Sequence, residues 1–547
     1  MSFKSIKRVL ALAALPAVSA AIAIALTACT SQDDLRQQRG EKADKHFEAL
    51  QKRAIPADVT LTLPQCIEAA LKNNLDLKVD NLKESIAKEK RTAEILGMLP
   101  DLTVSEDLTH RNNQPGSSSE SLITGQQSLE PSKSSETTEA DTKVELALST
   151  LDFGLAYFNS LQAHDKVFHE GQQAKRTAQN LVVDVVTAYF KVASTQYAVE
   201  KTEKLLALCD KVDADLENLA SEKAISPLRA LDEETRFITQ RKRLMEFRRS
   251  YENSCMELRS LMGYLPSKDI KVDVSCLDKL NTIAISDPDI LSRIAIKERP
   301  ELYQLDLQQH ITVLEARKTI LMMFPNVRAF TDFNNSTNKY LYNQSWMEVG
   351  LHAAYNLLKL PQQIEQYRTL DKEADSIDVK TMAMTVGVLA QVRIAHANMM
   401  EVKDRYELDQ RIYNTHKKHL DYAKSNADAL GKLTPLDIAR LELETAEASI
   451  DRTQSLGNYY LAYYRLLNTI GVEAIDQKKI DETVAKLADE AVKEAEAEKS
   501  ATPSDSLTEA EAEAIRDTMD FGSKSGAPKS TAPEAINSPE PDAAKGK

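Results

Sequence analysis

The stretch GKLTPLDIARLE, residues 431 to 442, contains the only proline between Pro361 and Pro503. The residues around it have the composition of a long helix, and a proline inside a helix costs roughly 3 kcal/mol because it lacks the N–H and clashes with the preceding turn. In the first turn of a helix this cost disappears, since the N–H groups there have no partner within the helix. We therefore interpret Pro435 as the start of a second helix, with Thr434 as its N-cap.

A second stretch has the same design. AISPL, residues 224 to 228, contains Pro227, and Gly263 follows this proline after 36 residues. Gly471 follows Pro435 after the same 36 residues. The proline is therefore a repeated feature, and we expect two helical hairpins that turn at equivalent points of an internal repeat.

The repeat begins well before the prolines. ALKNNLDL (70 to 77) leads to MLP (98 to 100), and AIKERPEL (295 to 302) leads to MFP (323 to 325), so the numbering of the two copies differs by 225. At the hairpin prolines the offset is 208, so the first copy has 17 extra residues. The polar, Ser-rich segment 110 to 141 is the candidate insertion, and its composition is typical of an exposed loop.

Each copy is expected to contain a short helical segment, a long helix and a returning helix. A helix of about 65 residues extends about 100 Å, which is longer than a globular domain. In chain order, the expected helices cover residues 64 to 98, 157 to 221, 228 to 262, 287 to 323, 362 to 429 and 436 to 470.

Between the first two helices of each copy the pattern changes to strict alternation. KVELALST (143 to 150) and WMEVGLHAAY (346 to 355) place apolar residues at every second position, which indicates strands. Weaker partners precede them, and strands of this length, about 9–11 residues, can cross a bilayer at a tilt. A small soluble sheet packed on the helices fits the alternation equally well. The two expected hairpins cover about residues 101 to 151 and 326 to 356, and Tyr340, Tyr342 and Trp346 would lie at the lipid headgroups.

The N-terminus indicates secretion. Basic residues precede an apolar run from Val9 to Ala25, and the run ends in Leu-Thr-Ala-Cys at Cys29. Residues 1 to 28 therefore form a signal peptide. The ending resembles the lipobox of bacterial lipoproteins, which implies that Cys29 is acylated, with palmitate among its chains, and that residues 29 to 60 form a lipidated linker. The alternative is an ordinary signal peptide with an incidental cysteine.

The remaining features exclude several classes of protein. A formal net charge of −14 argues against nucleic-acid binding, which requires a basic face. No phosphate-binding glycine loop and no nucleophile elbow is present, so we expect no enzyme, no cofactor and no metal site. Residues 476 to 547 are acidic, rich in Ala, Ser and Pro, and nearly free of large apolar groups, so we expect a mostly disordered tail.

Residues 61 to 473 resemble the TolC-like outer-membrane factors of tripartite efflux and type I secretion systems. The resemblance rests on TLTLPQCIEAALKNNLDLKV, VELALSTLDFGLAYFNSLQA and KERPEL, and most specifically on GKLTPLDIARLELETAEASIDRTQSLGNYYLAYYRLLNTIG. It implies a mainly α fold with a small β part, built from repeats at 61 to 285 and 286 to 475.

The resemblance also implies an assembly. Three copies with four strands per protomer would form a twelve-stranded transmembrane β-barrel, continued by a long α-helical barrel. Such a homotrimer acts as a passive exit duct in the outer membrane and works with a periplasmic adaptor and an inner-membrane pump. The rival hypothesis is a periplasmic coiled-coil lipoprotein that acts as a scaffold or tether. Drugs, metal ions and polypeptides are all possible cargoes for a duct of this kind.

In such proteins the hairpin tips form the periplasmic gate and meet the adaptor. The tip residues carried over to this chain are Lys223, Ser226, Pro227, Arg229, Gly431, Thr434, Pro435 and Asp437. The family commonly has Gly and Asp at the flanks of both tips, and the first tip departs from this with Lys223 and Arg229. An ion pair between Arg229 and Asp437 of neighbouring tips is one hypothesis, and two separately solvated charges are the alternative.

Overall fold

The computed structural model describes residues 32–53, 59–128, 130, 132–133, 135–221, 226–267, 270–277, 287–425, 435–472, 485–486, 489–490 and 493. The chain divides into two units, Met1–Asp489 and Glu490–Lys547, and the fold lies in the first unit. The expected signal peptide and Cys29 lie outside the described residues, as does most of the expected acidic tail.

The described fold is mainly helical, with a four-stranded antiparallel sheet and a separate parallel pair of two-residue strands. After an isolated helix, α2 (Gln32–Gln51), and the short strand β1 (Thr60–Leu61), the first repeat contains α3 (Leu63–Asn73), α4 (Leu75–Leu96), β2 (Asp101–His110), β3 (Thr138–Ser149), α5 (Thr150–Ser221) and α6 (Pro227–Leu261). After β4 (Lys271–Val272) and η1 (Ser275–Leu277), the second contains α7 (Pro288–Glu298), α8 (Pro300–Leu321), β5 (Asn326–Ser336), β6 (Ser345–Ala354), η2 (Leu357–Lys359), α9 (Leu360–Ser425) and α11 (Pro435–Ile470).

The internal repeat is confirmed at the level of single residues. Each bound of α3 and α4 recurs in α7 and α8 at an offset of 225, and the first residues of β2 and β5 have the same offset. The first residues of α6 and α11 are 208 apart. The extra residues of the first copy lie mainly between β2 and β3, at 111–137, where the second copy has only 337–344.

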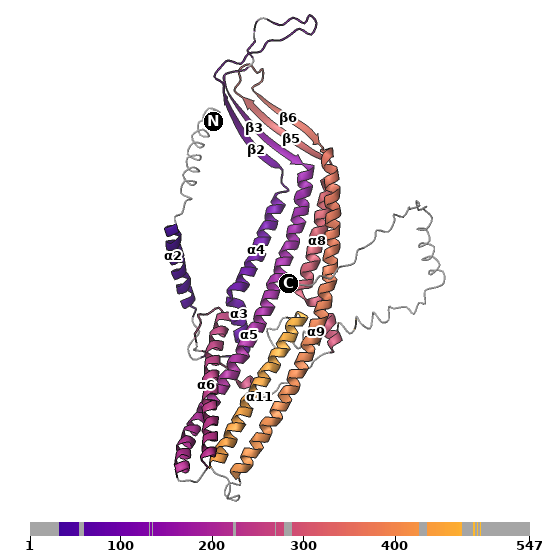
Figure 1. Ribbon diagram of the computed structural model, residues 1–547. Coiled ribbons are helices and arrows are strands. Elements are labelled where there is room, and N and C mark those ends of the chain that lie inside the picture. The colour runs from indigo at the N-terminus through magenta and orange to yellow at the C-terminus, as the bar shows by residue number, and fades with distance from the viewer. Residues whose placement is uncertain are drawn as a thin grey trace, which may run out of the picture. The chain divides into compact units, whose positions relative to one another are not determined.

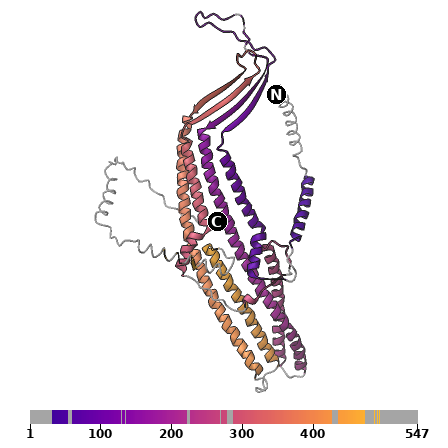
Figure 2. The same ribbon diagram turned by 180° about the vertical axis from the view of Figure 1, so that it is seen from behind.

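The four long strands form one antiparallel sheet in the order β2-β3-β5-β6. The two hairpins meet at the β3–β5 pair, so β2 and β6 are the two edges. Figures 1 and 2 show the sheet at one end of the long helices, with the first turns of α6 and α11 at the opposite end. Strand β3 begins earlier than expected, at Thr138, because its ladder with β2 continues to the pair of Thr138 with His110.

The helices differ from the sequence prediction in three places. The segment expected to be one helix from 64 to 98 is broken at Asn74, whose side-chain oxygen accepts hydrogen bonds from the backbone N–H groups of Asp76 (2.9 Å) and Leu77 (3.1 Å). This cap starts a new helix. The second copy breaks at the equivalent Arg299, which is extended because Pro300 follows it. The helix expected from 157 begins at Thr150, directly after β3.

The helices pack around α5, which contacts α4, α6, α8 and α11. The apolar stripe expected on this helix is buried: Val185 and Val186 are fully buried, and Tyr189 is 1% exposed. The Tyr189 hydroxyl donates a hydrogen bond to the carbonyl of Asp273 at 2.9 Å, next to the parallel β1–β4 pair that joins the start and end of the first repeat. In the described part of the chain, no helix is both long and apolar enough to cross a membrane.

Candidate functional site

One face of the sheet is mainly apolar, apart from one row that contains Glu106, Thr142, Asn335 and Ser345. The ladder registers place Leu102, Leu146, Thr331 and Val349 in one row across the four strands. Parallel rows on the same face contain Val104, Leu108, Val144, Leu148, Ala329, Phe333, Met347 and Leu351. Most of these side chains are exposed, and Leu351 reaches 78%. An exposed apolar patch of this kind requires a partner or a lipid surface.

The opposite face of the same sheet is charged. Glu145, Asp332 and Glu348 are direct neighbours in one row. Lys143 Nζ lies 2.6 Å from a Glu145 oxygen and 2.9 Å from an Asp332 oxygen, and Arg328 also pairs with Glu145. The indole of Trp346 lies on this face, opposite Asn334, and the expected place of the three aromatic residues at the lipid headgroups stays a prediction.

The hairpin tips lie at the other end of the helices. Helix α6 begins at Pro227, with Ser226 at the N-cap position, and α11 begins at Pro435. Proline therefore occupies the first position of both returning helices, as the sequence predicts. The Ser226 hydroxyl makes no capping hydrogen bond.

The remaining tip residues are only partly described. Arg229 lies in the first turn of α6 and Asp437 in the first turn of α11. Lys223, Gly431 and Thr434 lie outside the described residues. The ion pair between Arg229 and Asp437 of neighbouring tips therefore stays a prediction.

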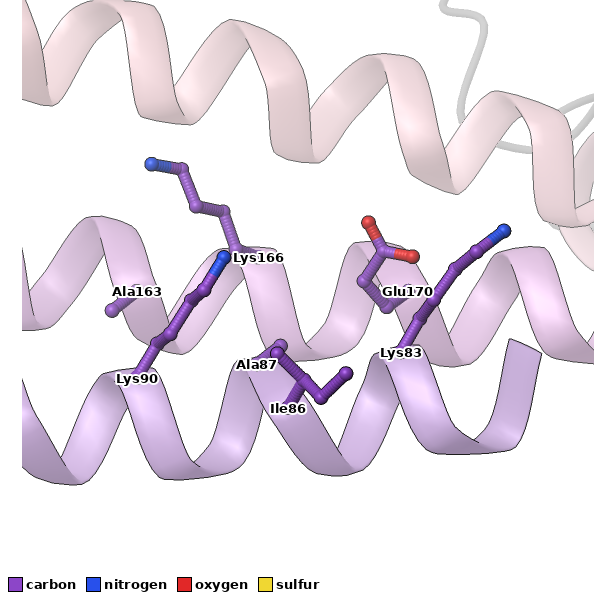
Figure 3. Close-up of a pocket in the computed structure, with 7 residues that line it drawn as sticks. All are labelled: Lys83, Ile86, Ala87, Lys90, Ala163, Lys166 and Glu170. Carbon is purple, nitrogen blue, oxygen red and sulfur yellow. The ribbon is translucent and has the colours of Figure 1, made fainter. Parts of the chain in front are cut away.

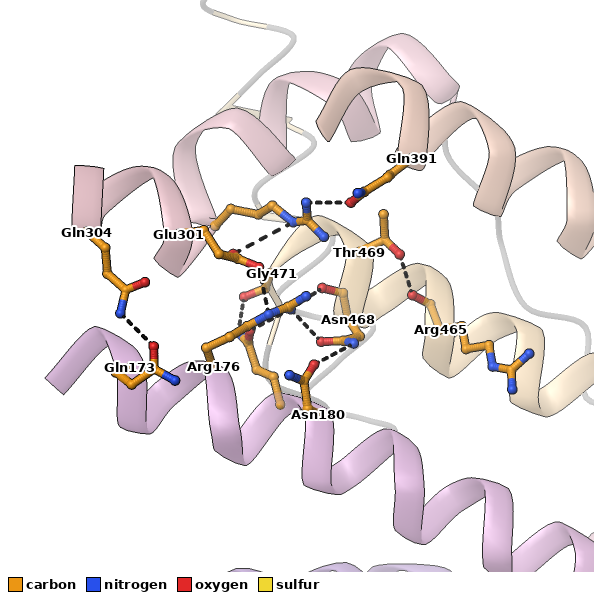
Figure 4. A network of polar contacts seen from close by, with 12 residues as sticks. Gln173, Arg176, Asn180, Glu301, Gln304, Gln391, Arg465, Asn468, Thr469 and Gly471 are labelled. Carbon is orange, nitrogen blue, oxygen red and sulfur yellow. Dashed lines mark hydrogen bonds and ion pairs between the residues drawn. The ribbon is translucent and has the colours of Figure 1, made fainter. Parts of the chain in front are cut away.

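A polar network at mid-height joins both repeats (Figure 4). The Arg176 guanidinium of α5 lies 2.7 Å from Glu301 of α8 and donates hydrogen bonds to the backbone carbonyl (3.2 Å) and side-chain oxygen (2.8 Å) of Asn468. Gln179 donates to the carbonyl of Gly471 at 2.7 Å. These contacts bind the carbonyl groups at the end of α11, which have no partner within the helix.

Arg299 extends the same network to α9. Its side chain is 5% exposed and donates to the Gln391 side chain at 2.7 Å. Burial lowers the pKa of the Arg299 guanidinium, and the nearby Glu301 carboxylate opposes this effect. Sequence reasoning missed the network because its members lie on four different helices. The only sequence signal is Arg299 itself, which directly precedes a proline at a helix boundary.

A groove of about 360 Å³ lies between α4 and α5 (Figure 3). Its floor is apolar, and its rim carries three lysines and one glutamate. The lining residues are Lys83, Ile86, Ala87, Lys90, Ala163, Lys166 and Glu170. Across the ranges that the structure describes, no three His, Cys, Asp or Glu side chains are grouped so that they could hold a metal ion. Neither the groove nor the network contains a nucleophile beside a general base.

The comparisons with known proteins agree with this architecture. CusC, described as forming a transmembrane channel, matches with a TM-score of 0.60 at 15% identity over 76% of this chain and 93% of CusC. The outer-membrane channel CmeC of Campylobacter jejuni matches with a TM-score of 0.58 at 12% identity over 78% of this chain and 89% of CmeC.

A third structure is the open state of the outer-membrane channel MtrE of Neisseria gonorrhoeae. It matches with a TM-score of 0.59 at 15% identity over 75% of this chain and 89% of MtrE. No protein-family model matches the sequence, and no curated protein sequence matches it. The chain therefore has the fold of the TolC-like outer-membrane channels, which are not enzymes, and the class indicated by the sequence is confirmed at the level of fold.

Proposed function

We propose that this protein is the outer-membrane exit duct of a tripartite efflux or type I secretion system. The observation that carries the proposal is the two-faced sheet, with its apolar side exposed and its charged side opposite. A transmembrane strand alternates in this way, because one face meets lipid and the other meets a water-filled lumen. A small soluble sheet would cover its apolar face with helices, and here Leu351 and Val349 are 78% and 75% exposed.

The duct requires more than one copy. Four strands leave two open edges, and an unpaired backbone group in lipid costs several kcal/mol. Two copies would supply eight strands, a number whose interior is filled by side chains, whereas three copies leave space for a lumen. The homotrimer is therefore the smallest assembly that both closes the sheet and conducts.

The helices support the same assembly. On α4, Leu75, Val79, Leu82 and Ile86 are each more than half exposed and are spaced by four, three and four residues, which is the spacing of a helix-packing seam. On α9, Val379, Met382 and Val386 are at least 60% exposed. Because α4 and α9 are the outer helices of the series α4, α5, α8 and α9, their apolar faces would meet between copies.

The length of the helices suits a passage through the periplasm. Helix α5 has 72 residues and therefore extends about 108 Å from the sheet. The tips at its far end would form the periplasmic gate and the docking site for the adaptor, which connects the duct to the inner-membrane pump. The tip residues are Lys223, Ser226, Pro227, Arg229, Gly431, Thr434, Pro435 and Asp437. Transport is passive here, because the pump supplies the energy.

The N-terminus would anchor the assembly. Acylation of Cys29 after removal of residues 1 to 28 places a lipid anchor in the outer membrane beside the barrel. Stable anchoring normally requires more than one acyl chain or a second membrane contact, and the barrel supplies that contact.

Membrane extraction and liposome flux distinguish the duct from a periplasmic scaffold. We expect a Cys29→Ser variant, secreted through an ordinary signal peptide, to remain in the outer membrane as a heat-sensitive trimer and to release small ions from liposomes. A scaffold held only by its lipid would become a soluble protein after the same change. A soluble monomer that leaves liposomes intact would overturn the proposal.

A separate experiment addresses the tips. Cross-linkers placed at residues 226 and 437 of the folded trimer should capture a periplasmic adaptor protein. If Arg229 and Asp437 form an ion pair, Arg229→Asp should increase the leak of the closed channel, and the double variant Arg229→Asp with Asp437→Arg should restore it. If neither Arg229→Asp nor Asp437→Arg changed the leak of the closed channel, the ion pair would be contradicted.

A further inference from the structure

The two edge strands carry charged side chains on the face that the proposed duct turns toward its lumen. Asp107 lies on β2, and Arg111 is the first residue after this strand. Glu348 and His352 lie on β6. All four share the face of Lys143, because the registers place Asp107 opposite Asp141, and Glu348 opposite Asp332. Among the described residues, none of these four side chains has an ion-pair or side-chain hydrogen-bond partner.

Because the chain is an internal repeat, each residue of the edge strands β2 and β6 has an equivalent in the central strands β5 and β3. Asn326 of β5 corresponds to Asp101 of β2, at an offset of 225. Their hairpin partners are Ala354 and Ala147, so β6 corresponds to β3 at an offset of 207. The β3–β5 pair at the centre of the sheet is thus a template for a contact between β6 and the β2 of another copy.

The template gives definite residue pairs. Val144 pairs with Phe333, so Leu351 should face Leu108 of the next copy on the apolar side. On the charged side, Glu145 pairs with Asp332, and the equivalent residues are His352 and Asp107.

Two rows further along this face, the equivalent residues form a full ion pair. Asp141 pairs with Ser336 at the end of the central ladder, and the corresponding edge residues are Glu348 and Arg111. The backbone N–H of Arg111 donates to the carbonyl of Thr137 at 2.7 Å, so the β2–β3 ladder continues to this residue.

We propose that β6 of one copy pairs antiparallel with β2 of the next in this register, with Glu348 opposite Arg111 and His352 opposite Asp107. The proposal rests on the duct function, since only a closed sheet needs this contact. The pairing brings together opposite charges that lack partners within one copy, which favours cross-strand pairing. It also brings an imidazole beside Asp107, which otherwise faces the like charge of Asp141.

Neighbouring registers lack this match. A shift by two residues, which keeps the apolar side outward, puts Glu348 opposite Thr109 or Asn113 and separates His352 from Asp107. A shift by one residue would turn the apolar face of one copy toward the charged face of the next. Charge and apolar patterning therefore select the same register as the repeat.

Engineered disulfides test the register in the full-length protein. Each copy would carry Leu351→Cys with Leu108→Cys, and oxidation should convert the assembly into a covalent trimer on a non-reducing gel. The matched control, Leu351→Cys with Leu102→Cys, places the second thiol six residues away along β2. That distance is about 20 Å, so the control should stay monomeric on the gel. The parent chain controls for the native cysteines.

Charge exchange tests the complementarity independently. Glu348→Arg and Arg111→Glu should each lower the temperature at which the trimer dissociates in detergent, and the two changes together should restore it. Glu365→Arg on α9, which removes an ion pair to Arg368 within one copy, should not be rescued by Arg111→Glu.

The outcomes separate this proposal from the duct function itself. A protein that conducts, but in which the control pair with Leu102→Cys cross-links in place of the pair with Leu108→Cys, would overturn the register and leave the duct intact. The register would also be overturned if the double charge exchange did not raise the dissociation temperature above that of the single changes. A protein that neither oligomerises nor conducts would overturn the duct function.

Discussion

At the end of the first repeat Gly263 lies against the carbonyl of Asn73, and at the end of the second Gly471 lies against the carbonyl of Glu298. Both glycines have positive φ, 74° and 81°. A Cβ at either would lie 2.7 Å from the Asn73 oxygen or 2.8 Å from the Glu298 oxygen. Because backbone meets backbone here, a single residue type fits in both copies.

Close to these glycines, the side-chain contacts differ between the two repeats. In the first copy Asn74 starts α4 and donates to the carbonyl of Leu261 at 3.2 Å, at the end of α6. In the second copy Arg299 occupies the equivalent position, and Arg176 from α5 binds the carbonyl of Asn468 near the end of α11. The repeats therefore conserve the backbone geometry while the polar groups that satisfy it have changed.

The largest expected effect concerns the apolar face that both repeats share. Val144→Arg and the equivalent Leu351→Arg should each destabilise the membrane-inserted trimer by about 2–4 kcal/mol, since a charge would face the bilayer core. Asn334→Arg on the opposite face is the control and should cost little. Urea titration in lipid vesicles measures the difference. Equal losses on both faces would contradict the assignment of lipid and lumen sides.

The two glycines should come next. Gly263→Ala and Gly471→Ala should each destabilise the fold by roughly 1–3 kcal/mol, because alanine is strained at positive φ and its Cβ would meet a carbonyl oxygen. Gly387→Ala on α9 is a matched control with open space around it, and should stabilise the helix by about 0.5–1 kcal/mol. Thermal unfolding of the three variants checks the order. A loss at only one of the two sites would break the equivalence of the repeats.

Substitutions at the two equivalent helix breaks, Asn74 and Arg299, should have different effects in the two copies. Asn74→Ala removes a cap and the hydrogen bond to the Leu261 carbonyl, and should cost at least about 1 kcal/mol. Asn74→Asp keeps the cap but replaces the donor by an oxygen that faces this carbonyl, so it should retain only part of the stability. Arg299→Ala should instead loosen α9, because Arg299 makes no capping bond and binds Gln391. Amide hydrogen exchange distinguishes the two, with faster exchange in α4 for the first variant and in α9 near Gln391 for the second.

A pH dependence at the Asp80 site should be present in the first repeat and have no counterpart at the equivalent position of the second. Hydrogen bonds from Lys83 (2.8 Å) and Thr177 (2.6 Å) lower the pKa of Asp80, whose equivalent in the second copy is Leu305. A carboxylate with a lowered pKa stabilises the fold above the ordinary pKa of aspartate, about 3.9, and this contribution is lost as the pH falls through the lowered value. Asp80→Asn should therefore lower the unfolding temperature at pH 7 and converge with the parent in acid.

The smallest effect should come from the inserted loop. Shortening the connection 111–137 to eight residues, as in the second copy, while keeping Arg111 and Thr137, reduces the loop by less than about fourfold. This changes the closure free energy by about 1 kcal/mol or less and leaves the proposed pair of Arg111 with Glu348 in place. We expect an unchanged unfolding temperature within that margin and an unchanged single-channel conductance. A large change in conductance would show that this loop lies over the outer mouth.

The sequence predicted those elements whose signals are local or repeated. Pro227 and Pro435 marked helix starts, and the repeat offset of 225 located α7 and α8 because both copies obey the same backbone geometry. Asn74 was missed, since an asparagine inside a helical pattern is recognised as a cap only when its hydrogen bonds are seen. The contacts of Arg176 and Tyr189 join segments far apart in the chain, and no spacing within a single helix specifies them.

Single-channel recording in a planar lipid bilayer shows whether three copies of this protein enclose a passive, water-filled duct. We expect stepwise, ohmic conductance from the purified trimer with no nucleotide or ion gradient as energy source, and we expect this conductance to be lost when the trimer is dissociated by heating. A trimer that inserts into the bilayer without conducting, or a purified protein that never inserts, would contradict this expectation.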